Sequence, residues 1–171
     1  MFCRFKARLV ALGNHQKKDI DYHDTYAPVF RLDLLRLCLA FSTTSNQIEV
    51  DQMDVVTAFL NGDLNEEIYL KTPQGYQSRA RFVRLLKSLY GLKQAPNEWH
   101  KVINKLVDSL GFKPVEVTPC VYVKWLSPQQ FVIVIVYVDD IGFIGSRDLI
   151  DSTKSALAVR LKMKDLGSMS K

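Results

Sequence analysis

Two adjacent carboxylates, Asp139 and Asp140, end a run of eight apolar residues in this 171-residue chain. A second apolar stretch, IGFIG, follows at once. A continuous run rich in Val and Ile predicts a strand buried on both faces, so the piece is typical of a hairpin that carries both acids at its tip. Neighbouring like charges repel, and a divalent cation between them would remove the repulsion. The alternative is that both are ordinary turn residues, because Asp favours turns.

A third acid, Asp54, follows an expected strand over residues 47–53. If that strand and the hairpin are neighbours, the three carboxylates can converge. Carboxylates without His or Cys favour hard ions, hence Mg²⁺ or Mn²⁺. Two such ions can activate an attacking oxygen and stabilise a leaving oxygen on phosphorus. The pattern therefore indicates phosphoryl transfer, and here nucleotidyl transfer.

The elements that must position these acids are short strands and amphipathic helices. Strands are expected over 5–11, 47–53, 67–71, 81–86, 119–125 and from 131 onwards. Helices are expected over 33–42, 97–110 and 148–161, where apolar residues recur at helical spacing. Because consecutive strands can pair as hairpins, the pattern predicts the α+β class, with an antiparallel sheet and helices on one face.

The distribution of charged residues and cysteines limits which classes of function this protein can have. The net charge is +5, and an acidic stretch at 49–67 precedes a basic stretch at 71–105. This order suits metal ions flanked by a polyanion, although a solvated charged surface explains either stretch alone. The three cysteines and three histidines are scattered, so we expect no zinc site and reduced thiols in an intracellular protein. Because the longest apolar run is far below the roughly 20 residues that span a bilayer, we expect no membrane partner.

Longer strings of the sequence resemble the reverse transcriptases of the Ty1/copia class of retrotransposon. The strings are KARLVALG, DTYAPVFRL, QMDVVTAFLNGDLNEEIYL, SLYGLKQAPNEWH, YVDDIGFIGS and MKDLG. They follow the family order over nearly the whole chain. The resemblance implies an RNA-directed DNA polymerase that uses dNTPs, a primer on an RNA or DNA template, and two Mg²⁺ ions, with Mn²⁺ as an alternative.

The resemblance also implies a fold and a domain organisation. The fold is a polymerase palm, with a ferredoxin-like antiparallel sheet, plus part of the fingers. Residues 1–171 would form one palm and fingers domain, with a fingers-like part at about 1–45 and a return segment at about 62–90. We expect no room in this chain for a thumb or an RNase H domain. The family also implies synthesis within a Gag-Pol-type polyprotein, and a location in the cytoplasm, in virus-like particles or in the nucleus.

The acids carry specific roles in this resemblance. Asp54 matches the first catalytic acid, which bridges both metal ions, and the Val55 carbonyl would help to hold the nucleotide-bound ion. Asp139 matches the second bridging acid. Asp140 matches the third catalytic and metal-site acid, placed near the primer 3′ end. Tyr137 would pack near the primer terminus of the primer–template, with an ordinary strand tyrosine as the alternative.

Five further residues match nucleotide-contacting positions of the family. Phe59 would lie under the incoming sugar, with a core phenylalanine as the alternative. Lys6 and Arg8 match fingers residues that hold the triphosphate, with a solvated basic strand edge as the alternative. Gly91 and Gln94 lie in the loop that contacts nucleotide and template, and Gln94 could equally cap a helix.

Three basic positions of the family pattern are not basic in this chain, where Leu12, Val56 and Asn97 stand. Each lost cation removes a phosphate contact and weakens template binding. The main alternative is therefore a decayed, inactive retrotransposon fragment that keeps the fold. A nucleic-acid-binding module without catalysis has less support, because no helix-turn-helix, zinc-finger or aromatic RNA-binding motif is present.

Overall fold

A computed structural model of the chain describes residues 7–45, 47–76 and 80–169. These residues form two compact units. The first comes from the described parts of 1–26 and 59–99, and the second from 27–58 and 100–171. The predicted fingers-like division at 1–45 and 62–90 stays a prediction.

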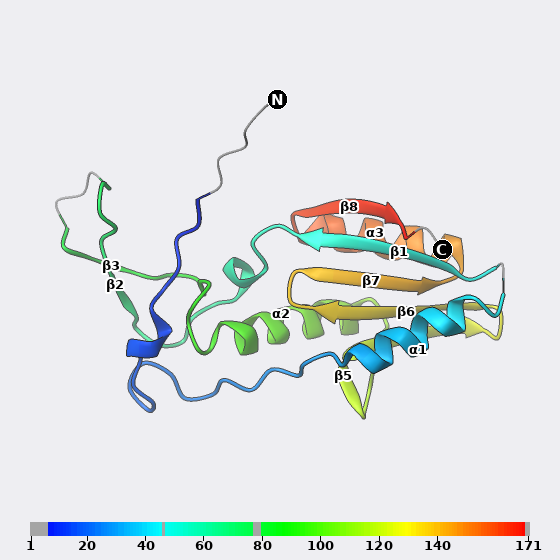
Figure 1. The fold of residues 1–171 in the computed structure, drawn as a ribbon, viewed down its shortest axis with the longest axis horizontal. Helices are drawn as coiled ribbons and strands as arrows, with labels where there is room; N and C mark the ends of the chain where they lie inside the picture. Colours follow the sequence, from blue (N-terminus) through cyan, green and yellow to red (C-terminus); the bar gives the residue numbers. More distant parts are fainter. Residues whose placement is uncertain (1–6, 46, 77–79, 170–171) are drawn as a thin grey trace. The chain divides into compact units, whose positions relative to one another are not determined.

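The second unit is built on a six-stranded antiparallel sheet in the order β4-β5-β6-β7-β1-β8 (Figure 1). The strands are β1 (Glu49–Val55), β4 (Lys113–Val115), β5 (Thr118–Ser127), β6 (Gln130–Tyr137), β7 (Asp140–Gly145) and β8 (Met163–Ser168). The apolar run forms β6, a central strand, and most of its side chains are buried. The sheet confirms the predicted α+β class and the predicted hairpin of β6 and β7.

Three helices accompany the strands: α1 (Leu32–Ser42), α2 (Ala95–Ser109) and α3 (Arg147–Arg160). Each begins within two residues of its predicted start, since its apolar spacing is a local property of the sequence. On α2, Trp99, Ile103 and Val107 recur at four-residue intervals and are all buried. Gly111, with φ of 84°, follows the end of this helix, where glycine is the usual stop.

The helices lie on both faces of the sheet, so the prediction of one covered face is wrong. Cys38 of α1 packs in one core cluster with Val50 of β1. Asp51, the next residue of β1, instead contacts Lys154 of α3. Because successive strand residues point to opposite faces, α1 and α3 lie on opposite faces of the sheet (Figure 1). Tyr122 of β5 forms a 3.5 Å hydrogen bond with His100 of α2.

A buried ion cluster ties β1 to α3 and β8. Asp51 is 1% exposed and accepts hydrogen bonds from Arg147, at 3.1 Å to each carboxylate oxygen, and from Lys154 at 2.6 Å. Lys154 also pairs with Asp165 of β8 at 2.7 Å. Burial raises the pKa of Asp51, but the hydrogen bonds from Arg147 and Lys154 outweigh it and leave that pKa below its ordinary value. The cluster anchors β8 beside β1.

The first unit has little regular structure. It contains the two-stranded antiparallel sheet of β2 (Tyr69–Lys71) and β3 (Phe82–Arg84), the 3₁₀ turn η1 (Gly13–His15), and all but the first residue of the 3₁₀ turn η2 (Ala58–Asn61). The strand expected over 5–11 is not found in its described part, residues 7–11. The backbone there bonds to a loop instead, with the Ala11 N–H donating to the Tyr90 carbonyl at 2.8 Å. No helix in the described ranges is long and apolar enough to cross a membrane.

Candidate active site

The structure brings the three predicted catalytic acids to one end of the sheet. Asp54, near the end of β1, is the cross-strand partner of Asp140, the first residue of β7. Directly opposite residues of an antiparallel pair project from the same face, so these two side chains are neighbours. Asp139 lies in the turn before β7, where its carbonyl accepts a 2.7 Å hydrogen bond from the Val55 N–H. The backbone therefore places all three acids around the β1–β7 junction.

The turn that carries Asp139 has an unusual backbone. Only Val138 and Asp139 separate the paired residues Tyr137 and Asp140. Such two-residue hairpins favour turns with positive φ, usually at glycine or asparagine. Here Val138 has φ of 54°, although a β-branched residue is strongly disfavoured in this region. Strain of this kind costs about 1–3 kcal/mol and clusters at functional sites, so the turn supports a functional role for the hairpin.

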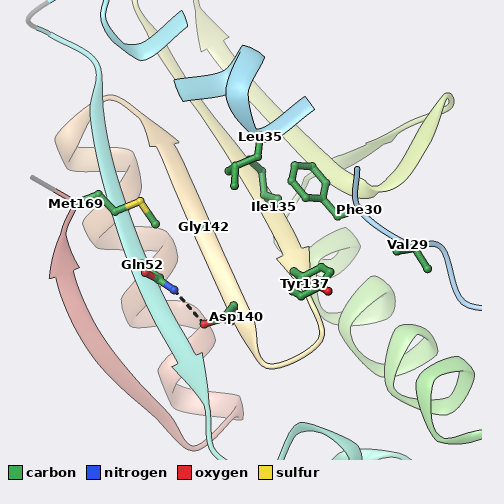
Figure 2. Close-up of a pocket in the computed structure, with 9 residues that line it drawn as sticks. All are labelled: Val29, Phe30, Leu35, Gln52, Ile135, Tyr137, Asp140, Gly142 and Met169. Atoms are coloured by element: carbon green, nitrogen blue, oxygen red, sulfur yellow. Dashed lines mark hydrogen bonds between the residues drawn. The ribbon is translucent and has the colours of Figure 1, made fainter. Parts of the chain in front are cut away.

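Each of the two facing acids has a different polar neighbour. Gln52 of β1 donates a hydrogen bond from Nε2 to Oδ1 of Asp140 at 2.9 Å (Figure 2). Lys164, the partner of Asp54 in the β1–β8 register, brings its Nζ within 3.7 Å of Asp54 Oδ2. Asp54 therefore lies between an acid on β7 and a lysine on β8.

The three acids at this junction meet some of the requirements of a magnesium site. Their oxygen-only chemistry and facing backbone positions suit a hard divalent ion. Within residues 7–45, 47–76 and 80–169, however, no group of three or more His, Cys, Asp or Glu side chains is gathered where it could hold an ion. The contacts of Asp54 with Lys164 and of Asp140 with Gln52 give a physical reason, because each draws its carboxylate toward a different neighbour.

A cavity of about 410 Å³ opens on the α1 face beside Asp140. Figure 2 shows Gln52, Asp140 and Tyr137 at one end of it, while its remaining lining is apolar. Those other residues are Val29, Phe30, Leu35, Ile135, Gly142 and Met169. Tyr137 is exposed here, on the same face as Asp140, and its predicted contact with the primer stays a prediction.

Phe59 belongs to the first unit and is 8% exposed. Its ring packs on Tyr90 with centroids 4.4 Å apart, and the Arg8 guanidinium lies 5.7 Å from the centre of the Tyr90 ring. Phe59 and Arg8, which were both predicted to contact the nucleotide, therefore both contact the Tyr90 ring. Their roles toward a nucleotide stay predictions, and Lys6 lies outside the described residues.

Gly91 and Gln94 have clear packing roles in the same unit. Gly91 has φ of 94°, and a Cβ there would lie 2.0 Å from the Ala11 carbonyl oxygen, so only glycine fits. Gln94 is fully buried, accepts a 3.0 Å hydrogen bond from Gln16 and donates one of 2.9 Å to the Asp21 carbonyl. These contacts account for both residues without a ligand, and their nucleotide contacts remain untested predictions.

Sequence reasoning did not find Gln52 and Lys164 beside the acids of the second unit, or Tyr90 beside Phe59 in the first unit. Each lies inside a string that carries the family resemblance, in QMDV, MKDLG and SLYG respectively. That was the available signal. Which neighbour each side chain contacts depends on strand register and loop packing, so the strings alone could not assign the contacts.

Sequence comparisons show which known proteins this chain is similar to. The family described as "Reverse transcriptase (RNA-dependent DNA polymerase)" matches residues 1–171. The retrovirus-related Pol polyprotein from transposon TNT 1-94 of Nicotiana tabacum is 42% identical over 168 residues, which cover 96% of this chain and 13% of that protein. The Pol polyprotein from transposon RE1 of Arabidopsis thaliana is 34% identical over 95% of this chain and 11% of its own length.

A yeast protein is also similar to this chain. The transposon Ty1-H Gag-Pol polyprotein of Saccharomyces cerevisiae is 30% identical over 94% of this chain and 8% of its own length. The chain therefore spans roughly a tenth of the length of these three relatives. No solved structure matches the chain.

Proposed function

Because this chain belongs to the reverse transcriptase family of Ty1/copia-type retrotransposon Pol polyproteins, we propose that it forms the core of an RNA-directed DNA polymerase. The proposed reaction is nucleotidyl transfer from a dNTP to a primer 3′ end. The observation that carries the proposal is the facing pair Asp54 and Asp140, with Asp139 in the strained turn between β6 and β7. The proposed fold is a palm built on the six-stranded sheet, with fingers supplied by the other part of the chain.

The proposed chemistry forms one phosphorus–oxygen bond and breaks another. The primer 3′ oxygen attacks the α-phosphorus, its proton passes to solvent water, and pyrophosphate departs. Two Mg²⁺ ions, when bound, would activate the attacking oxygen and stabilise the leaving one. Asp54 and Asp139, with the Val55 carbonyl, would hold these ions. Asp140 would complete the acidic group beside the primer terminus.

Other residues of the chain would bind and select the substrate. Arg8 offers an exposed cation for the triphosphate, and it contacts the same Tyr90 ring on which Phe59 packs. We propose that Phe59 excludes a ribose 2′-hydroxyl, which is selection by repulsion. Tyr137, exposed on the Asp140 face, would pack against the primer. The proposed partners are dNTPs and a primer–template. We propose that the chain is made as part of a Gag-Pol-type polyprotein, like the yeast relative.

A primer-extension assay tests this proposal. The purified 171-residue chain is given oligo(dT) on poly(rA), dTTP, and Mg²⁺ or Mn²⁺. We expect extension by the parent and none by Asp54→Asn or Asp139→Asn, because an amide keeps the shape but loses the charge that binds a metal ion. Asp108→Asn makes the same change at an exposed helix position and should extend like the parent.

Two outcomes would count against the proposal. Extension by Asp139→Asn at the parental rate would remove its catalytic role. A folded parent that extends no primer with either ion would favour the decayed, inactive fragment, in which Leu12, Val56 and Asn97 stand at positions where the family is commonly basic.

A further inference from the structure

Strands β2 and β3 form an antiparallel ribbon in the first unit (Figure 1). In its register Tyr69 pairs with Arg84, and Lys71 pairs with Phe82. Alternate residues of a strand point to one face, and directly paired residues share that face, so these four side chains lie on the same side of the ribbon. Each aromatic ring therefore has a cation opposite it, and all four residues are exposed.

The two rings are the apolar part of this exposed face. Tyr69 is 59% exposed and Phe82 is 53% exposed. Leu70 and Val83, which pair on the opposite face, are partly buried. A single exposed ring is common on protein surfaces, whereas two rings on one narrow ribbon, each beside a cation, favour a surface that binds a ligand.

The backbone holds the two rings at a fixed spacing. The Leu85 N–H donates to the Ile68 carbonyl at 2.8 Å, and the Thr72 N–H donates to the Arg81 carbonyl at 3.0 Å, so the ladder continues past both ends of the paired residues. The two aromatic residues are diagonal neighbours in this ladder, roughly 7–8 Å apart. A surface that is already ordered loses little conformational freedom when it binds a ligand.

Three cations accompany the rings: Lys71, Arg81 and Arg84. The Arg81 guanidinium lies 5.6 Å from the centre of the Phe82 ring, which is a cation–π contact. Arg84 pairs with Glu67 at 3.0 Å, and both side chains are more than half exposed. Such a surface pair contributes little to stability, so a phosphate can take the place of the carboxylate. Cations thus outnumber acids on the ribbon and favour an anionic partner.

A cavity of about 470 Å³ adjoins the same ribbon. Tyr69, Lys71 and Phe82 are among its lining residues, and most of the others are apolar, including Leu9 and Leu12. All of these residues belong to the first unit. The space suits a flat group with apolar faces and polar edges, and an unpaired nucleobase is such a group.

We propose that the β2–β3 ribbon binds single-stranded nucleic acid, with bases stacked on Tyr69 and Phe82 and phosphates against Lys71 and Arg84. Unpaired bases stack on aromatic rings, and their phosphates pair with cations, so the ribbon offers both kinds of contact on one face. The two rings come from different strands, and no local sequence motif marks them. The inference goes beyond the proposed function, because the three acids belong to the other unit and this binding needs neither a metal ion nor a dNTP.

The test measures binding of fluorescein-labelled, single-stranded oligo(dT) to the whole chain by fluorescence anisotropy, in EDTA and without dNTPs. Tyr69→Ala and Phe82→Ala should each weaken binding about tenfold, because each removes one stacking surface. Tyr69→Phe keeps the ring and should bind like the parent. Tyr26→Ala is the matched control, since it removes a 71% exposed ring of the same unit outside the ribbon, and it should also bind like the parent.

Two further measurements separate phosphate contacts from stacking. Lys71→Met should reduce the slope of log affinity against log salt by about 0.7, because one phosphate contact is lost. Lys113→Met, at an exposed lysine of the second unit, should leave that slope unchanged. With an oligo(dT)–oligo(dA) duplex, Tyr69→Ala and Phe82→Ala should bind like the parent, since paired bases are not free to stack on a ring.

Four results would overturn the inference. A parent that does not bind oligo(dT) at low salt, or alanine variants with parental affinity, would exclude nucleic acid from the ribbon and leave its face to a protein partner. Equal losses for single strand and duplex would indicate a general polyanion surface. A loss from Tyr69→Phe as large as that from Tyr69→Ala would exclude stacking. Should an alanine variant unfold, the valine variant, which retains strand propensity but lacks the ring, replaces it. A chain that extends no primer can still pass this test, so the two proposals fail separately.

Discussion

Asp54 and Asp140 face each other across the β1–β7 ladder, and each carboxylate has a different partner, Lys164 for Asp54 and Gln52 for Asp140. Like charges directly opposite on two strands destabilise the pair, by roughly 0.2–1 kcal/mol. Lys164 offsets one of these charges, and Gln52 hydrogen-bonds the other acid. Because a bound divalent ion would offset the remaining repulsion, we expect the stability of the fold to depend on divalent ions.

The first prediction concerns this repulsion. In a Lys164→Met background, Asp54→Asn removes one of two facing charges without loss of an ion pair. In EDTA, thermal unfolding should therefore occur about 1–4 °C higher than in Lys164→Met alone. With Mn²⁺ the order should reverse, because only the variant that retains Asp54 is stabilised by binding the ion. The same order of Tm in both buffers would mean that Asp54 does not take part in ion binding.

A second prediction concerns the buried carboxylate of Asp51. Asp51→Asn leaves Arg147 and Lys154 facing a neutral amide and should cost roughly 3 kcal/mol of unfolding free energy, measured in urea at pH 7. Asp108→Asn, at an exposed ion pair, should cost less than about 1 kcal/mol. Equal losses from the two variants would show that the cluster contributes no more than a surface pair.

The third prediction is the pH dependence of that cluster. The pKa of Asp51 is lower in the folded chain than in the unfolded one, where it is near its ordinary value. The folded state is therefore stabilised above the unfolded pKa of about 3.9, and this stabilisation is lost as the pH falls through the folded pKa. Urea unfolding between pH 7 and pH 3 should show a smaller loss for Asp51→Asn than for the parent. Parallel plots of unfolding free energy against pH for the two proteins would contradict the assignment of this pH dependence to Asp51.

The fourth prediction separates two roles for Phe59. Its burial against Tyr90 means that Phe59→Val must lower the Tm, since it removes an aromatic pair and leaves a cavity. If Phe59 is a sugar gate, Phe59→Val should also begin to incorporate ribonucleotides in the primer-extension assay. Tyr90→Phe, which keeps the ring, should retain the parental preference for deoxyribose. A lower Tm with unchanged sugar preference would leave Phe59 as a packing residue only.

The last prediction concerns the missing cations. Leu12 is 66% exposed, whereas Asn97 is 5% exposed and its Oδ1 has no hydrogen-bond partner within the described chain. Leu12→Lys should therefore strengthen primer–template binding and steepen the slope of log affinity against log salt by about one unit. Asn97→Arg should instead lower the Tm, because a buried charge lacks room and solvent. Fluorescence anisotropy at several salt concentrations measures the first effect, and an unchanged slope would exclude Leu12 from the binding surface.

The sequence by itself determined the candidate acids and the elements whose patterns are local. The eight-residue apolar run predicted a strand buried on both faces, and the acids after it marked a turn. Helical spacing located α1, α2 and α3 to within two residues, because a helix closes its hydrogen bonds within its own segment. The six strings carried the family resemblance.

Only the tertiary structure decided which neighbours the acids have. Strand β8, with the polar sequence MKDLGS, has no apolar pattern and forms because β1 offers a free edge and Asp165 pairs with Lys154. Its register then places Lys164 beside Asp54. The positions of α1 and Gln52 also depend on contacts with distant segments. Such contacts place α1 on the face opposite α3, and a hydrogen bond turns Gln52 toward Asp140. A sheet obtains its hydrogen bonds and cross-strand contacts from distant segments, so register and face are properties of the assembled sheet.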